Sequence, residues 1–237
     1  MTTHKHPELD LTGSIRPGLD ILANEIVIAL KKRSRFSQND QIYLPGLVVT
    51  QPDISLLEYE LAAIERCHAE LGRYTFASQE SFTDVTQVTP VIKRELPDSP
   101  IMRTRSGAAA KIIAFYRDWV HTACTPGDVP SSFGETVTAD VNALLSIIER
   151  VNLGKLVAES KFQELTQEFL QTGGDREGML ALIVRKDREA SVMELAANLA
   201  HHYDLNPEHA QSVFRFMIDL TVEIEVDYLK QRIADYK

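Results

Sequence analysis

Residues 135–172 read ETVTADVNALLSIIERVNLGKLVAESKFQELTQEFLQT and form the longest uninterrupted helical pattern of the 237-residue chain. Gly173 and Gly174 follow directly and predict a C-terminal stop. A continuous helix of this length spans about 55 Å, because each residue adds about 1.5 Å. We therefore expect one long central helix against which the other elements pack.

This expected helix carries two cations where a core-facing helix would carry apolar side chains. Arg150 and Lys161 are eleven residues apart, about three turns, which puts them on one face with Cα atoms about 16 Å apart. Gly154, Val157 and Ala158 lie between them on that face and are small enough to leave room for a ligand. A small dianion would fit between the two cationic tips. Spacing alone favours the alternative of a solvent-exposed face, since most Lys and Arg residues are exposed.

The C-terminal helix has clear boundary signals. Asn206 is a suitable N-cap, Pro207 suits the first helical position, and the pattern runs to about residue 234. Thr221 and Glu225 are four residues apart and share a face that borders the apolar side. Either residue taken alone is equally well explained as a surface residue. We expect four apolar residues of this helix to point inward: Val213, Met217, Leu220 and Ile224.

Five further segments have helical periodicity. We expect helices over residues 14–34, 53–74, 105–123, 175–186 and 187–203. Ser14 and Asp53 are the expected N-caps of the first two. Residues 75–103 are irregular, and no pair of alternating segments joined by a tight turn predicts a sheet. The sequence thus predicts an all-α fold, with a flexible tail over residues 1–10 and a single-domain helical bundle over residues 11–237 that has long central and C-terminal helices.

Composition excludes several classes of function. The formal net charge is -9 and the pI is about 5.3, which argues against binding to nucleic acid or a membrane surface, because both need a basic face. A small basic pocket for an anionic metabolite remains compatible with this charge. No segment is long enough to span a bilayer and residues 1–10 lack an apolar signal core, so we expect a cytoplasmic protein.

Metal and nucleophile motifs are missing from the sequence. Cys67 and Cys124 are far apart, the seven histidines form no H-E-x-x-H motif, and the adjacent His201 and His202 diverge on a helix. The phosphate-binding G-x-x-x-x-G-K-[ST], the dinucleotide-binding G-x-G-x-x-G and the G-x-S-x-G nucleophile motif are also absent. We expect neither a metal nor a cofactor.

Three stretches resemble one known family, the all-helical chorismate mutases of fungi and plants. Residues 150–163, RVNLGKLVAESKFQ, resemble the central helix of that family, which reads approximately RIHFGKFVAEAKF. Residues 221–229, TVEIEVDYL, resemble its end, and residues 15–16 and 33–36 resemble its first helix. The resemblance covers nearly the whole chain in order and is weak over residues 37–55 and 75–130. It implies an enzyme that rearranges chorismate to prephenate without metal, cofactor or covalent intermediate.

The resemblance implies substrate-binding roles for four residues. Arg16 and Arg150 would bind the two carboxylates of chorismate, and Thr221 would assist at a carboxylate. Glu189 would hold the ring hydroxyl. Glu189 also lies in the charged run 185–189, which by itself is typical of a solvated face.

Two further residues would act at the breaking bond. The resemblance places Lys161 and Glu225 at the ether oxygen, where negative charge grows as the C–O bond breaks. A fixed ammonium there favours the transition state over the ground state. Glu225 can help only when it is protonated, and burial raises a carboxylate pKa. We therefore expect activity to be favoured toward acidic pH.

The chain departs from the family pattern at a substrate-binding position and at a regulatory one. Arg185 stands where fungal members have a polar amide near the ring hydroxyl, and it would point away or alter substrate preference. Fungal members also bind tyrosine and tryptophan between two subunits. Gly72 replaces one of two consecutive arginines at that site, and Ser132 and Glu135 also differ, which argues against this regulation. Three residues match the regulatory site: Arg73, Gly134 and Thr138.

The resemblance implies a homodimer and leaves two other functions open. One is a mutase or pyruvate lyase that acts on a chorismate relative such as isochorismate or aminodeoxychorismate, which Arg185 would favour. The other is a non-catalytic binding or effector protein that retains the fold. The complete set of charged candidates argues against the latter, because buried unpaired charges are costly. A chorismate-consumption assay with product analysis distinguishes the three.

Overall fold

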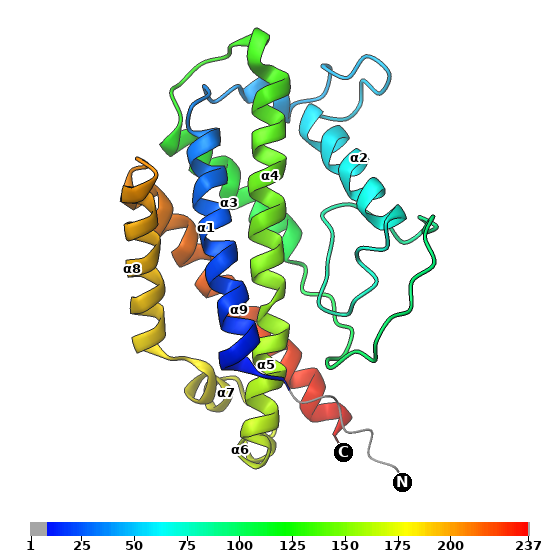
Figure 1. Cartoon of the computed structure of the whole chain (residues 1–237), viewed down its shortest axis with the longest axis vertical. Coiled ribbons are helices and arrows are strands. Elements are labelled where there is room, and N and C mark those ends of the chain that lie inside the picture. Colours follow the sequence, from blue (N-terminus) through cyan, green and yellow to red (C-terminus); the bar gives the residue numbers. More distant parts are fainter. Residues whose placement is uncertain (1–8, 237) are drawn as a thin grey trace.

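The computed structural model describes residues 9–236, which fold into helices joined by loops (Figure 1). Within this range the only β-pairing is an isolated bridge between Pro45 and Ser55, so the predicted all-α class is confirmed. Residues 1–8 of the expected tail lie outside the described part of the chain. None of the helices between residues 9 and 236 combines the length and the hydropathy needed to cross a membrane.

The elements follow one another along the chain as short turns and longer helices. In order they are the π-helical turn η1 (Leu11–Ile15), α1 (Arg16–Arg33), η2 (Asp40–Tyr43), α2 (Leu56–Glu70), α3 (Ala108–Ala123), η3 (Pro130–Ser132), α4 (Phe133–Asn152), α5 (Gly154–Glu164), α6 (Thr166–Gln171), α7 (Arg176–Ile183), α8 (Lys186–His202) and α9 (Pro207–Asp235).

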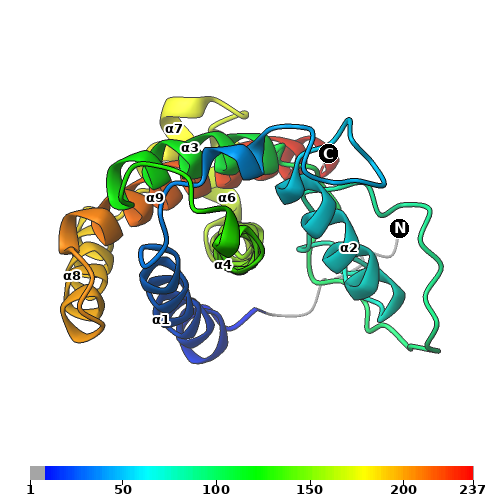
Figure 2. The same ribbon diagram turned by 90° about the horizontal axis from the view of Figure 1, so that it is seen from above.

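The helices pack around α4 and α5, which follow each other through the length of the molecule (Figure 1). Figure 2 looks down α4 and shows α1 on one side of it and α2 on the other, with α3 and α9 above it in this view. The helix α8 lies beside α1 and packs against α9, which also contacts α5. One apolar core fills the space between α1, α3, α4 and α9, and a smaller one lies between α5, α6, α7 and the end of α9.

The C-terminal helix matches its sequence signals. Asn206 caps α9 by accepting a hydrogen bond from the amide of Glu208, and Pro207 is its first residue. All four residues predicted to point inward, 213, 217, 220 and 224, are buried. The apolar period and the cap are local features, which is why the sequence alone locates this helix.

The predicted continuous central helix is wrong, because the structure divides it into α4, α5 and α6. At Leu153 the backbone stays in the α region (φ −62°, ψ −18°), but the amides of Leu156 and Val157 both donate to its carbonyl, a local tightening of the helix. At Leu165 the backbone leaves the helical region (φ −120°, ψ 40°). The predicted stop is confirmed, since Gly173 and Gly174 have φ values of +60° and +89°.

The first two helices begin at other caps than predicted. Asp10, not Ser14, accepts the backbone amides at the start of η1, and the α-helix begins only at residue 16. Ser55, not Asp53, caps α2 through a capping box in which Ser55 and Glu58 each accept the other's amide. The other predicted helices begin and end within a few residues of their expected bounds.

Two fully buried charged residues hold the long irregular stretch between α2 and α3. Glu65 accepts hydrogen bonds from the amides of residues 82 and 83, at 2.8 and 2.7 Å. Lys155 donates to the carbonyl of Thr104 at 2.7 Å and to the carboxylate of Glu80. These contacts attach the loop to α2 and α5. Lys155 directly follows Gly154, the first residue of α5.

Candidate active site

A hollow of about 850 Å³, its open mouth included, lies where η1, α1, α5, α8 and α9 meet. Side chains from all of these elements and from the last turn of α4 line it. The residues that the sequence singled out for catalysis and substrate binding all line this one hollow: Arg16, Arg150, Lys161, Arg185, Glu189, Thr221 and Glu225. The exposed-face alternative for Arg150 and Lys161 is therefore wrong.

Arg150 is a buried cation with no ion pair among residues 9–236. It lies in the last turn of α4, is 7% exposed, and its Cζ is 5.3 Å from the ring centroid of Phe214. Its Nε is buried and has no hydrogen-bond partner in the described chain. Burial lowers the pKa of Arg150 to about 10, although the carboxylate of Asp20 opposes the shift. A buried guanidinium with an unused donor is suited to an anionic ligand.

Lys161 and Glu225 form an ion pair across the hollow, from α5 to α9. The Lys161 amine donates to Glu225 Oε2 at 2.8 Å and to the carbonyl of Ile183 at 2.9 Å. An ammonium has three donors, so one N–H remains for a ligand. Burial raises the pKa of Glu225 and the charge of Lys161 lowers it, with burial the stronger influence. This carboxyl group therefore keeps its proton to a higher pH than an exposed glutamate.

Thr221 and Gly154 set the distance between α9 and α5. A Cβ placed on Gly154 would lie 2.7 Å from the Thr221 methyl carbon, which is closer than two nonbonded carbon atoms approach each other in folded proteins. Gly154 thus makes room for a neighbouring helix as well as for the hollow that it lines. Of the other two residues expected beside it, Val157 lines the hollow, whereas Ala158 is buried in the core. The hydroxyl oxygen of Thr221 is buried without a hydrogen-bond partner in the described residues.

The remaining charged residues lie toward the mouth. Arg16 is the first residue of α1, and Glu189 lies in the first turn of α8; both are half-buried. Arg185 is exposed and pairs with Asp187 at 3.4 Å. The charged run 185–189 is therefore mostly solvated, as its composition predicts, and Glu189 is the residue of the run that is half-buried at the hollow.

Sequence reasoning missed several residues that line the same hollow. Four of them lie three residues from a predicted one, so helical spacing could have found them: Leu19, Arg188, Val192 and Ile218. Leu11 carried no such signal, because the π-helical turn that holds it precedes the expected start of the first helix.

The three residues matched to a regulatory site do not share a hollow within one chain. Arg73 pairs with Glu149 at 3.1 Å beside α4. Gly134 and Thr138 line a separate groove between α4 and α2. Gly72 has a φ of +82°, a conformation in which an arginine would be strained. The local backbone thus explains why a glycine stands at that position.

Comparison with known sequences identifies relatives along almost the whole chain. A family model described as Chorismate mutase type II matches residues 134–226. The chorismate mutase of Emericella nidulans is 29% identical over 250 residues, which cover 95% of this chain and 93% of that protein. The chorismate mutase of Schizosaccharomyces pombe is 26% identical, over 93% of this chain and 95% of that protein.

Solved structures have the same fold. The Candida albicans chorismate mutase, crystallised with L-Trp, superposes with a TM-score of 0.87 at 25% identity, over 94% of this chain and 92% of that one. The chloroplast chorismate mutase of Zea mays gives a TM-score of 0.79 at 24% identity over 96% of this chain and 99% of that one, a likeness of fold. Sequence, fold and the shared hollow agree: along almost its whole length the chain is similar to the all-helical chorismate mutases of fungi and plants, enzymes of the isomerase class.

Proposed function

We propose that this chain rearranges chorismate to prephenate in the hollow between α5 and α9. One observation carries the proposal. Two buried donors, Arg150 Nε and Thr221 Oγ1, have no partner in the described chain and line the same hollow as the Lys161–Glu225 pair. Buried polar groups are normally satisfied, so these donors are suited to a bound anion.

The two arginines would hold the substrate in a reactive shape. Chorismate is a flexible dianion whose reactive chair-like conformer brings the enolpyruvyl carbon over the ring. Arg150 and Arg16 would each bind one carboxylate, and the Thr221 hydroxyl would add a hydrogen bond. Fixed carboxylates restrict the substrate to geometries close to the transition state. The entropy that the uncatalysed reaction loses on reaching this geometry is then already lost on binding.

Lys161 and Glu225 would act on the ether oxygen. In the rearrangement the C–O bond breaks as the new C–C bond forms, and no proton or electron leaves the substrate. Negative charge grows on the ether oxygen in the transition state, and the free N–H of Lys161 and a protonated Glu225 would both donate to it. The Ile183 carbonyl holds the amine at 2.9 Å, so little reorganisation is needed.

Glu189 would accept a hydrogen bond from the ring hydroxyl at the mouth, near Arg185. The neighbouring arginine is exposed and already paired with Asp187, so we propose that chorismate remains the substrate. Isochorismate, whose hydroxyl lies elsewhere on the ring, is the comparison substrate that would detect a change in preference.

The test is a direct assay of the purified chain with chorismate. Loss of the substrate absorbance, with prephenate as the product and with isochorismate left unchanged, is the expected result. Release of pyruvate, or no consumption of chorismate by a folded protein, would contradict the proposal.

We further propose a cytoplasmic homodimer. A maize relative, 23% identical over 93% of this chain, is described as cytosolic, and the groove of Gly134 and Thr138 carries three apolar residues of α2, the half-buried Leu56 and the exposed Tyr59 and Ala63. Sedimentation equilibrium would give twice the chain mass of 26.6 kDa if this is correct, and that mass itself if the chain is a monomer.

A further inference from the structure

Residues 9–15, here called the hook, close one side of the hollow. They comprise Leu9, Asp10 and the turn η1, which packs against both α1 and α5. Leu11 of the hook lines the hollow, and Arg16 follows the hook directly as the first residue of α1. The position of this substrate-binding arginine therefore depends on how the hook is held.

Two hydrogen bonds attach the hook to α5, the helix that carries Lys161. The amide of Leu9 donates to Gln163 Oε1 at 3.2 Å, and the hydroxyl of Ser160 donates to the Leu9 carbonyl at 3.4 Å. The Leu9 side chain packs against the smaller apolar core. The start of the hook is thus docked within one turn of a proposed catalytic residue.

Asp10 closes the turn that follows. Its Oδ1 accepts the amides of Thr12 and Gly13, at 3.0 and 2.7 Å. Its own carbonyl accepts the amides of Ser14 and Ile15, each at 3.2 Å. Because the carbonyl of residue 10 bonds five residues ahead, the turn is wider than an α-helical turn, and such π-helical turns occur frequently at functional sites.

Gly13 lies against the carboxylate of this cap. A Cβ at position 13 would lie 2.2 Å from Asp10 Oδ2, so any other residue requires the Asp10 side chain to shift from the position in which it caps. Asp10 is exposed and contributes nothing to the core. An exposed cap and the glycine that admits it thus determine the path of the chain immediately before Arg16.

We infer that Asp10 and Gly13 are positioning residues, which hold the hook so that Arg16 and Leu11 face the substrate. The inference rests on the proposed function of the hollow. Arg16 would bind a carboxylate that is present in both ground state and transition state, so a displaced Arg16 weakens binding of both. The expected signature is a higher KM with little change in kcat.

The test is a double-mutant cycle on kcat and KM for chorismate. We expect Asp10→Ala to raise KM about fivefold, with kcat nearly unchanged. A factor of about five corresponds to the free energy that a typical N-cap contributes. Gly13→Ala should have the same effect alone and no further effect in the Asp10→Ala background, because the displaced carboxylate is then already absent. Asp10→Asn should retain the wild-type KM, since an asparagine oxygen also caps.

Ser55→Ala is the matched control, because it removes an N-cap from α2, which does not line the hollow. It should lower stability and leave KM unchanged. An unchanged KM in Asp10→Ala, additive effects in the cycle, or an equal rise in Ser55→Ala would overturn the inference.

Hydrogen exchange separates failure of the inference from failure of the proposed function. If the wild type consumes no chorismate, the proposed function fails, and exchange of the amides of residues 12–15 in the free protein still tests the hook. Faster exchange in Asp10→Ala and Gly13→Ala, but not in Asp10→Asn, supports the positioning role. Equal exchange in all variants overturns it.

Discussion

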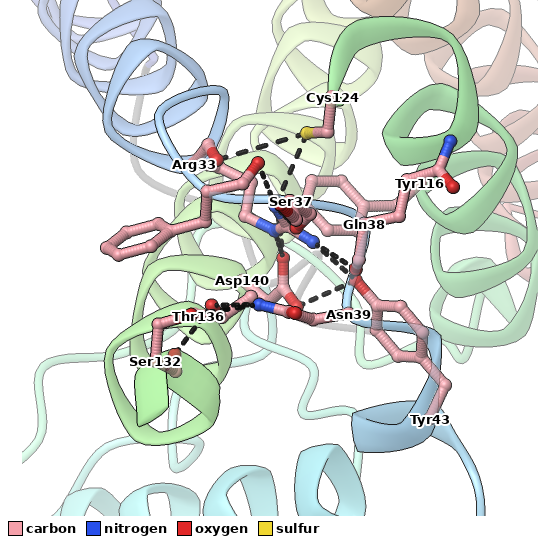
Figure 3. Close-up of polar contacts among 11 residues, drawn as sticks. Arg33, Ser37, Gln38, Asn39, Tyr43, Tyr116, Cys124, Ser132, Thr136 and Asp140 are labelled. Atoms are coloured by element: carbon pink, nitrogen blue, oxygen red, sulfur yellow. Dashed lines mark hydrogen bonds and ion pairs between the residues drawn. The ribbon is translucent and has the colours of Figure 1, made fainter. Parts of the chain in front are cut away.

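Two buried arginines beside α4 have opposite surroundings. Arg33 of α1 meets α4 two turns after its start, at Asp140, and all three of its side-chain nitrogens have partners (Figure 3). These partners include Asp140 and the carbonyls of residues 37 and 38. Arg150, in the last turn of α4, has a buried Nε without a hydrogen-bond partner and no carboxylate within ion-pair distance in the described chain. The two residues are of the same type and are both buried, but their charge is compensated very differently.

The difference is visible in their acidities. Burial works to lower the pKa of Arg33, but Asp140 and Tyr43 outweigh it and raise that pKa above its usual value. At Arg150 burial prevails and the pKa falls to about 10. A compensated buried charge is costly to leave without its partner, whereas an uncompensated one already lowers stability and is available to a ligand. The contrast supports a structural role for Arg33 and the binding role that we propose for Arg150.

The largest expected effect is the loss of activity in Arg150→Met. We expect kcat/KM to fall by about a thousandfold, because one substrate carboxylate loses its fixed guanidinium and the reactive conformer is no longer held. The unfolding free energy should rise by about 1–3 kcal/mol, since an unpaired buried charge is removed. Steady-state kinetics and urea denaturation on the same preparation measure both, and a destabilised variant would contradict the comparison.

Arg33→Met is the matched opposite. We expect it to lower the unfolding free energy by about 3–5 kcal/mol, because Asp140 would then be left buried with no cation beside it. Tyr43 and Tyr116, which also donate to Asp140 at 2.8 and 3.0 Å, cannot replace the charge. At low temperature, where part of the variant stays folded, the folded molecules should have wild-type kinetic constants. Lost activity per folded molecule would show that the two ends of α4 are not independent.

The third prediction concerns the pH dependence of the Lys161–Glu225 pair. Burial raises the pKa of Glu225, so its protonated form is present below that pKa and is lost as pH rises through it. We expect kcat/KM to fall by about tenfold per pH unit above this pKa. Arg150 has a pKa of about 10, so it keeps its charge at neutral pH and does not cause this change.

Glu225→Gln supplies the control for that profile. A glutamine donates at every pH, so the variant should have a flat profile and should exceed the wild type at alkaline pH. A profile that still falls in Glu225→Gln would assign the titration to another group.

The smallest expected effect follows from the contact of α5 with α9. Gly154→Ala places a methyl group 2.7 Å from the Thr221 methyl, which should cost about 1–3 kcal/mol in stability and reduce kcat/KM about tenfold. Thr221→Ser removes that methyl and keeps the hydroxyl, so adding it should restore most of both losses. No restoration would show that Gly154 acts through something other than its neighbour.

Much of the helical framework could be predicted from the sequence, because periodicity and caps such as Asn206 are local signals. The break at Leu153 could not, since it accompanies a contact with Thr221 almost 70 residues away. The same limit applies to Lys155 and Glu65, whose partners lie in an irregular loop. At the site, spacing alone favoured an exposed Arg150, and the family resemblance led to the correct placement in the hollow.

The interruption at Leu153 also constrains which changes in chain length the protein tolerates. Arg150 precedes the interruption and Lys161 follows it. The directions in which their side chains point relative to each other therefore depend on the rotation of the backbone at Leu153. One inserted or deleted residue between them would rotate one cation by about 100° relative to the other. Substitutions in this interval that respect packing therefore preserve the geometry, whereas a change in residue number does not.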